Sequence, residues 1–105
     1  MTGDIEKQDQ GKDMETTKIE VNVMIKNPHG LHARPAAQFV RIAGQYEDCH
    51  IVVDRDGMEV NGKSIMGMMM LQAGEGTNLR IIAEGDGAEE ACDELQKLID
   101  SGFGE

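Results

Sequence analysis

Four segments of the chain alternate between apolar and polar residues, and we expect each of them to form a β-strand. The pattern is clearest in the first segment, where Ile19, Val21, Val23 and Ile25 occupy every second position. A repeat of two residues places these side chains on one face of a strand, so that face is predicted to be buried. The four strands are expected near residues 17–25, 49–53, 58–60 and 79–83.

Three other segments carry small or apolar residues at helical spacing. The first predicted helix begins near His32 and ends near Gly44, with Pro35 in the first turn, where a missing N–H has little effect. The second is short and begins after Ser64, a residue type that favours the N-cap position. The third covers about residues 88–101. The order β-α-β-β-α-β-α predicts an α+β domain with a mostly antiparallel sheet.

The chain is acidic, with 20 Asp and Glu residues against 10 Lys and Arg residues and a formal net charge of -10. Nucleic acid is not an expected partner, because phosphate binding needs a basic surface. A partner protein with a basic surface fits the charge better, and simple solubility explains the charge equally well. No apolar stretch is long enough to cross a membrane and no signal peptide is visible, so we expect a cytoplasmic location.

Residues 1–16 differ from the rest of the chain because they are polar and contain few large apolar residues. We expect them to form a disordered acidic tail in front of one folded domain of residues 17–105. Cys49 and Cys92 lack the spacing of a metal-binding motif. In a cytoplasmic protein they are expected to be reduced thiols, while the sequence alone leaves a disulfide open.

Candidate chemistry lies at the start of the first predicted helix. The backbone N–H groups of the first turn, including that of Ala33, lack partners within the helix, and the helix dipole adds partial positive charge there. Such an end binds anions, including phosphate. The same charge favours the neutral form of an imidazole, whose lone pair makes His32 a nucleophile. Arg34 can donate paired hydrogen bonds to phosphoryl oxygens, so one segment supplies nucleophile, positive pole and clamp.

Other interpretations of these histidines stay open. A single histidine at a helix start is commonly a cap or a surface residue, and His50 is expected to be structural or exposed. His29 and His32 form an H-x-x-H pair, but no further ligand stands at a suitable spacing, so neither a metal nor another cofactor is expected. The chain has no glycine-rich nucleotide loop, so we expect no enzyme in the ordinary sense. A phosphoryl group would then come from one protein and pass to another.

The second predicted helix is unusually rich in methionine. Ile65, Met68 and Met69 share one face of this helix, whereas Met66 and Met70 point elsewhere, so some methionines are expected to remain exposed. We take Ile65, Met66 and Met69 as candidate docking residues, since methionine adapts to different partners. The alternative is that these methionines fill an irregular core.

Ser64 has two possible roles at the start of this helix. As an N-cap it is structural in its own right. It is also a candidate phosphorylation site, because a phosphate at a helix N-terminus is electrostatically tolerated. Negative charge would then stand beside the exposed methionines and alter docking without unfolding the domain.

Two motifs in this order resemble those of one family. Residues 30–36, GLHARPA, resemble the active-site signature of HPr, the histidine phosphocarrier of the bacterial phosphoenolpyruvate-dependent sugar phosphotransferase system. Residues 63–67, KSIMG, resemble the regulatory serine region of that family. The likeness covers roughly Thr17 to Glu105, and the acidic tail and the methionine run at 68–70 depart from the common pattern.

The resemblance implies an open-faced β-sandwich, in which a four-stranded antiparallel sheet is covered on one face by three helices. It implies that His32 accepts phosphate at Nδ1 from phosphorylated enzyme I and passes it to a histidine of an enzyme IIA domain, with Arg34 at the phosphate site. Ser64 would be the target of an ATP-dependent HPr kinase/phosphorylase. We expect such a carrier to be a monomer. A nitrogen-related carrier and a pure interaction module acting through Ser64 are the competing functions.

Overall fold

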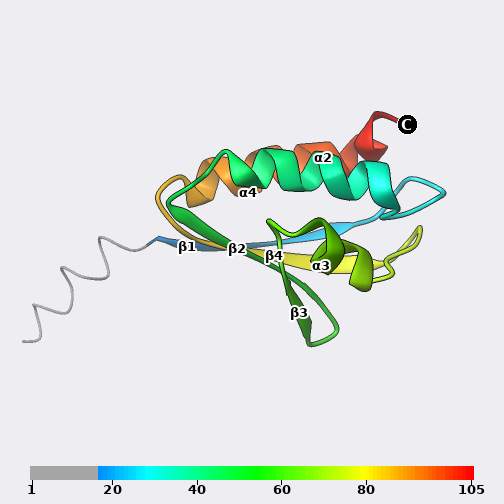
Figure 1. Cartoon of the computed structure of the whole chain (residues 1–105), viewed down its shortest axis with the longest axis horizontal. Helices are drawn as coiled ribbons and strands as arrows, with labels where there is room; N and C mark the ends of the chain where they lie inside the picture. Colours follow the sequence, from blue (N-terminus) through cyan, green and yellow to red (C-terminus); the bar gives the residue numbers. More distant parts are fainter. Residues whose placement is uncertain (1–16) are drawn as a thin grey trace, which may run out of the picture.

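An antiparallel sheet of four strands forms one layer of the structure, and helices α2 and α4 lie across one of its faces (Figure 1). The computed structural model describes residues 17–105, so the tail predicted at residues 1–16 lies outside the described residues. The strands are β1 (Lys18–Met24), β2 (Cys49–Arg55), β3 (Met58–Asn61) and β4 (Asn78–Gly85), in the spatial order β1-β4-β2-β3. The helices are α2 (Ala33–Gly44), α3 (Ile65–Met70) and α4 (Ala88–Asp100). The predicted α+β open-faced sandwich is confirmed.

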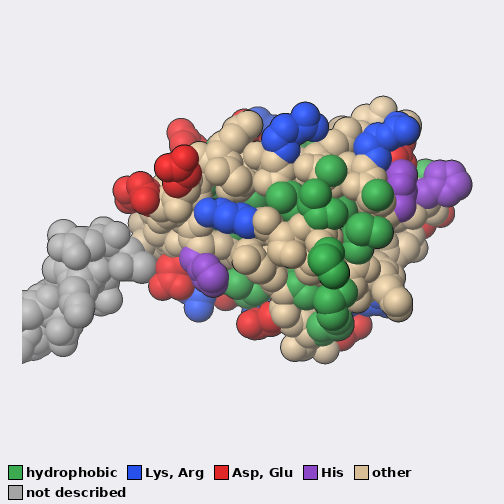
Figure 2. Space-filling view, in the orientation of Figure 1, with side chains coloured by type: hydrophobic (Ala, Val, Ile, Leu, Met, Phe, Trp, Pro, Cys, Tyr) green, Lys and Arg blue, Asp and Glu red, His purple; other side chains and the backbone are tan. Residues whose placement is uncertain are grey.

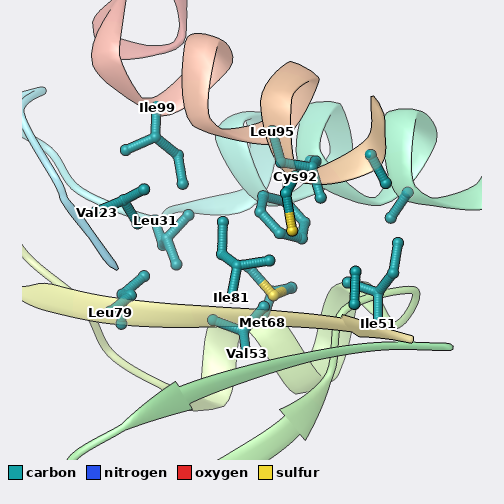
Figure 3. Packing of buried hydrophobic residues seen from close by; sticks show 14 of the residues in the cluster. Val23, Leu31, Ile51, Val53, Met68, Leu79, Ile81, Cys92, Leu95 and Ile99 are labelled. Carbon is teal, nitrogen blue, oxygen red and sulfur yellow. The ribbon is translucent and has the colours of Figure 1, made fainter. Parts of the chain in front are cut away.

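The core lies between the sheet and the helices, as Figure 3 shows. Strand residues at alternate positions face the helices, and the pairing of Val23 with Leu79 and of Val53 with Ile81 brings them side by side. Leu95 and Ile99 of α4 pack over them and are fully buried. Each such side chain contributes roughly 1.5–3 kcal/mol when removed from water. The period-two pattern of the strands therefore reflects one buried face.

Gly30 fixes the loop that leads into α2. Its φ of +68° lies in the left-handed region, and a β-carbon at this position would come within 2.4 Å of the carbonyl oxygen of Ala73. The next residue, Leu31, donates its N–H to that same oxygen at 2.9 Å. Only glycine combines this backbone conformation with so close an approach. The start of α2 is thereby held against the segment that follows α3.

The C-terminal end contains an element that the hydrophobic pattern does not predict. The last long helix ends at Asp100, and a short 3-10 helix, η1 (Gly102–Gly104), follows it. Phe103 is buried although its φ of 58° is rare for a residue with a β-carbon. Burial of the aromatic ring offsets that strain and turns the end of the chain back toward the start of α2.

Cys49 and Cys92 are both buried and both free, as the thiol prediction expects. Burial raises the pKa of each thiol, which keeps it in the unreactive protonated form. Across residues 17–105, no helix combines the length and the apolar character needed to span a membrane.

Candidate functional site

His32 is the N-cap residue of α2, with an extended backbone (φ -78°, ψ -171°). Its carbonyl accepts the first helical hydrogen bond from Ala36 at 3.0 Å, but its side chain forms no cap and no acidic residue stands in the first turn. Pro35 has no N–H, so the first turn offers the N–H groups of Ala33 and Arg34. Neither group has a hydrogen-bond partner among the described residues. The positive end of α2 is therefore open to an anion.

The imidazole of His32 is accessible and held on one side only. Its side chain is 41% exposed, and its Nε2 atom lies 2.9 Å from Oε2 of Glu105. An ionised carboxylate only accepts hydrogen bonds, so Nε2 carries the proton in this contact. In the neutral ring, Nδ1 then keeps its lone pair. The contact with Glu105 therefore favours the neutral tautomer in which the lone pair is on Nδ1.

Glu105 is itself held by Asn27. The buried amide of Asn27 donates from Nδ2 to Oε1 of Glu105 at 3.0 Å and to the carbonyl oxygen of Gly30 at 2.8 Å. The hydrogen bond from Asn27, followed by that from His32, lowers the pKa of the Glu105 carboxyl below its ordinary value of 4.5. The carboxylate is therefore ionised at neutral pH and can orient the imidazole.

Asn27 and Glu105 are functional candidates that the sequence motifs do not reveal. They lie 78 positions apart and meet only because Phe103, buried in η1, anchors the end of the chain. Phe103 is one of only two phenylalanines in the sequence and stands between two glycines. That isolated aromatic residue after the last helix is the one signal that could have pointed to this contact.

Arg34 stands where the sequence predicts it, in the first turn of α2. Its side chain is exposed and forms no ion pair or hydrogen bond with another residue in the part of the chain that the structure describes. The donors of the guanidinium remain available for phosphoryl oxygens. One end of α2 therefore brings together the three predicted site groups, which are the imidazole of His32, the backbone N–H of Ala33 and the side chain of Arg34.

His29 lies beside His32, with ring centroids 6.0 Å apart and ring planes at 88°. The two rings and Glu105 do not amount to a metal site. Within residues 17–105, no group of three or more His, Cys, Asp or Glu side chains is placed to hold a metal ion.

The second predicted site residue, Ser64, is the N-cap of α3. Its Oγ accepts a hydrogen bond from the N–H of Gly67 at 3.0 Å, which confirms the predicted cap. A β-carbon at Gly67 would come 3.3 Å from that same oxygen, so glycine leaves room around the hydroxyl. At the other end of α3, Nη1 of Arg55 donates to the carbonyl oxygens of Leu71 and Gln72, each at 2.8 Å. These contacts hold a helix of six residues that is too short to be stable alone.

The exposed apolar residues of α3 form a surface that we call the methionine patch, made of Ile65, Met66, Met69 and Met70. Met66 is 76% exposed and Met70 is 61% exposed, whereas Met68 is fully buried. The shared face expected for Ile65, Met68 and Met69 therefore does not form one buried stripe, because only Met68 reaches the core. The core-filling alternative holds for Met68 alone.

The methionine patch and the loop that leads to His32 belong to neighbouring parts of the fold. Figure 2 shows hydrophobic side chains gathered over α3, with histidine side chains at the neighbouring end of the domain. The hydrogen bond from Leu31 to Ala73 joins the loop before α2 to the segment after α3. A partner that covers the patch would thus lie close to the imidazole.

Known proteins share both the sequence and the fold of this chain. The family described as "PTS HPr component phosphorylation site" matches residues 19–101. A phosphocarrier protein HPr from Pseudomonas aeruginosa is 48% identical over 86 residues, which cover 81% of this chain and 94% of the relative. The chain belongs to the HPr family. An HPr-like protein Crh from Halalkalibacterium halodurans is 42% identical over 82 residues, 78% of this chain and 96% of that one.

The solved HPr structures agree with this assignment. An HPr from Thermoanaerobacter tengcongensis superposes with a TM-score of 0.79 at 49% identity, over 83% of this chain and 97% of that one. Membership in the HPr family makes the chain a phosphocarrier of the phosphotransferase system. The matched residues end at 101, so Phe103 and Glu105 are identified by the structure and not by the family match.

The hydrogen bonds to Glu105 predict a measurable titration. We expect the Glu105 carboxyl, followed by carbon NMR, to titrate below 4.5, and its pKa to rise both in Asn27→Ala and in His32→Ala, since each side chain donates a hydrogen bond to it. A folded-state pKa below the unfolded value means that this contact stabilises the fold above about pH 4.5 and is lost as the pH falls through the folded-state pKa. One common pKa in all three proteins would contradict this assignment.

Proposed function

We propose that this phosphocarrier accepts a phosphoryl group on Nδ1 of His32 from phosphorylated enzyme I and passes it to a histidine of an enzyme IIA domain. One observation carries the proposal. Glu105 holds Nε2 of His32 at 2.9 Å, so Nδ1 is the free nitrogen, and it stands at the N-terminus of a helix whose first turn contains no acidic residue. This arrangement joins a nucleophile to a site for the anion that it receives.

In the proposed transfer, the lone pair of Nδ1 attacks the phosphorus atom of the donor phosphohistidine. The new N–P bond forms as the old one breaks, and its electron pair returns to the donor nitrogen. Nε2 keeps its proton, so the phosphorylated ring is positively charged, and the carboxylate of Glu105 stabilises that charge. The N–H groups of Ala33 and Arg34, with the Arg34 guanidinium, bind the phosphoryl oxygens. Transfer to enzyme IIA is the same step with the roles exchanged.

The proposed cycle needs no nucleotide or metal on this chain. A hollow of about 370 Å³ lies at the N-terminal end of α4, where Asp86, Glu89 and Glu90 line it. That acidic lining would repel a nucleotide phosphate. We propose that the donor and the acceptor are proteins that dock on the methionine patch beside His32, and that the carrier acts as a cytoplasmic monomer.

Regulation at Ser64 is the second part of the proposal. Phosphorylation by an HPr kinase/phosphorylase would leave the phosphate at the N-terminus of α3, where the helix tolerates it. The domain would stay folded, and a double negative charge would stand at the edge of the methionine patch. Enzyme I would then meet a charged surface where it needs an apolar one.

A second candidate function is a regulatory interaction module, including the nitrogen-related branch. The exposed methionine patch next to the cap residue Ser64 favours it, since both features suit a partner that reads the phosphorylation state of the serine. The relative named Crh, 42% identical, is described as HPr-like. The accessible His32 favours the carrier role, because a pure interaction module has no need of a free nucleophile.

The central test is phosphorylation by enzyme I and phosphoenolpyruvate. We expect the wild-type chain to acquire an acid-labile phosphate and His32→Ala to acquire none. His50→Ala is the matched control, because His50 is exposed on β2 and should leave labelling unchanged. A label that persists in His32→Ala would refute the proposed acceptor.

Removal of Arg34 should slow the transfer while the fold stays intact. A hydrogen bond to a charged group is worth about 1.5–3 kcal/mol, so Arg34→Ala should lower the transfer rate roughly tenfold or more. Arg41→Ala removes an exposed arginine from the last turn of the same helix and should transfer at the wild-type rate. Stopped-reaction labelling measures both rates, and equal rates would remove Arg34 from the mechanism.

A charge at Ser64 should weaken phosphorylation by enzyme I. Ser64→Asp and Ser64→Asn both keep an N-cap oxygen and differ in charge. We expect Ser64→Asp to raise the KM for enzyme I roughly tenfold and Ser64→Asn to change it little. Circular dichroism checks that both remain folded. Identical KM values in the two variants would mean that Ser64 acts only as a cap.

A further inference from the structure

A second imidazole borders the acceptor histidine. His29 is exposed, its ring centroid lies 6.0 Å from that of His32, and the two ring planes are nearly perpendicular at 88°. His29 takes no part in the contacts that hold His32, since Nε2 of His32 is bonded to Glu105. Within residues 17–105, the imidazole of His29 forms no hydrogen bond or ion pair that would give it a structural role.

The backbone on both sides of His29 is rigid. Pro28 has a restricted φ, and Gly30 is packed against the carbonyl oxygen of Ala73. Asn27 closes the turn, because its carbonyl oxygen accepts from the N–H of Gly30 at 3.1 Å and its Nδ2 donates to the carbonyl oxygen of Gly30 at 2.8 Å. The loop therefore presents His29 at a defined position beside His32.

We infer that His29 is a second phosphoryl-binding residue, whose ring N–H donates a hydrogen bond to a phosphoryl oxygen carried on Nδ1 of His32. The inference rests on the proposed function, because it needs the phosphoryl group at that nitrogen. An imidazole carries at least one N–H in each of its protonation states, so the donor is always present. The contact of Nε2 with Glu105 leaves Nδ1 as the ring nitrogen that receives the phosphoryl group, and the ring of His29 lies 6.0 Å away, centroid to centroid.

No proton moves in this step. The electron pair of the donor N–P bond returns to the donor nitrogen, Nδ1 of His32 gains the phosphorus, and His29 keeps its proton while sharing it with an oxygen. His29 and Arg34 contribute from different segments, the loop before α2 and the first turn of α2. Negative charge that develops on the phosphoryl oxygens in the transition state then meets donors from both segments.

The experiment separates the ring of His29 from its N–H. His29→Phe keeps an aromatic ring without a donor, and His29→Gln keeps a donor without the ring. We expect His29→Phe to lower kcat for transfer from phosphorylated enzyme I roughly tenfold with an unchanged KM, and His29→Gln to restore most of the rate. His50→Phe, at an exposed position on β2, is the matched control and should transfer at the wild-type rate.

Phosphorus NMR of the phosphorylated chain gives a second readout that a merely structural role would not move. The resonance of phosphorylated His32 should shift in His29→Phe and stay in place in His50→Phe. Wild-type kcat and an unshifted resonance in His29→Phe would overturn the role of His29 and leave the proposed acceptor standing. A wild-type chain that takes no label on His32 would overturn both.

Discussion

The hydrogen bond between Glu105 and Nε2 of His32 decides which ring nitrogen keeps its lone pair in the neutral imidazole. A histidine at a helix start has two possible nucleophilic nitrogens, and the helix dipole does not choose between them. The carboxylate does, because it can only accept a hydrogen bond and therefore fixes the proton on Nε2. That contact joins residues 73 positions apart, so it exists only when the whole domain has folded. The chemistry of one side chain thus depends on packing at the far end of the sequence.

The packing responsible for this contact is that of Phe103. Its backbone conformation is unfavourable for a residue with a β-carbon, and burial of the ring is what maintains it. The turn that results brings Glu105 to Asn27 and His32. On the other side of the site, the close approach of Gly30 to Ala73 holds the loop that contains His29. Two tightly packed segments therefore border the imidazole of His32, which keeps its surroundings ordered while its ring stays accessible.

The regular elements could be predicted from the sequence, and the contacts between distant segments could not. Alternation identified the strands, because each has one face against the helices. Pro35 in the first turn indicated where α2 starts, and the capping preference of Ser64 indicated where α3 starts. The same rules are local and could not show that Asn27 and Glu105 meet. The helical pattern did not single out Met68 as the one buried methionine of α3, since a helix of six residues presents too few positions to define a buried face. The turn at Phe103 has a conformation that residue propensity alone disfavours.

The contact between Glu105 and His32 has a practical consequence for handling the protein. An affinity tag joined after Glu105 would begin next to the carboxylate that contacts the imidazole of His32. A tag that displaces the carboxylate would allow the neutral ring to carry its proton on Nδ1 instead of Nε2. The opposite end of the described chain is safer, because β1 starts at Lys18, away from the C-terminal end (Figure 1). Purification handles and fluorescent labels therefore belong at the amino-terminal side.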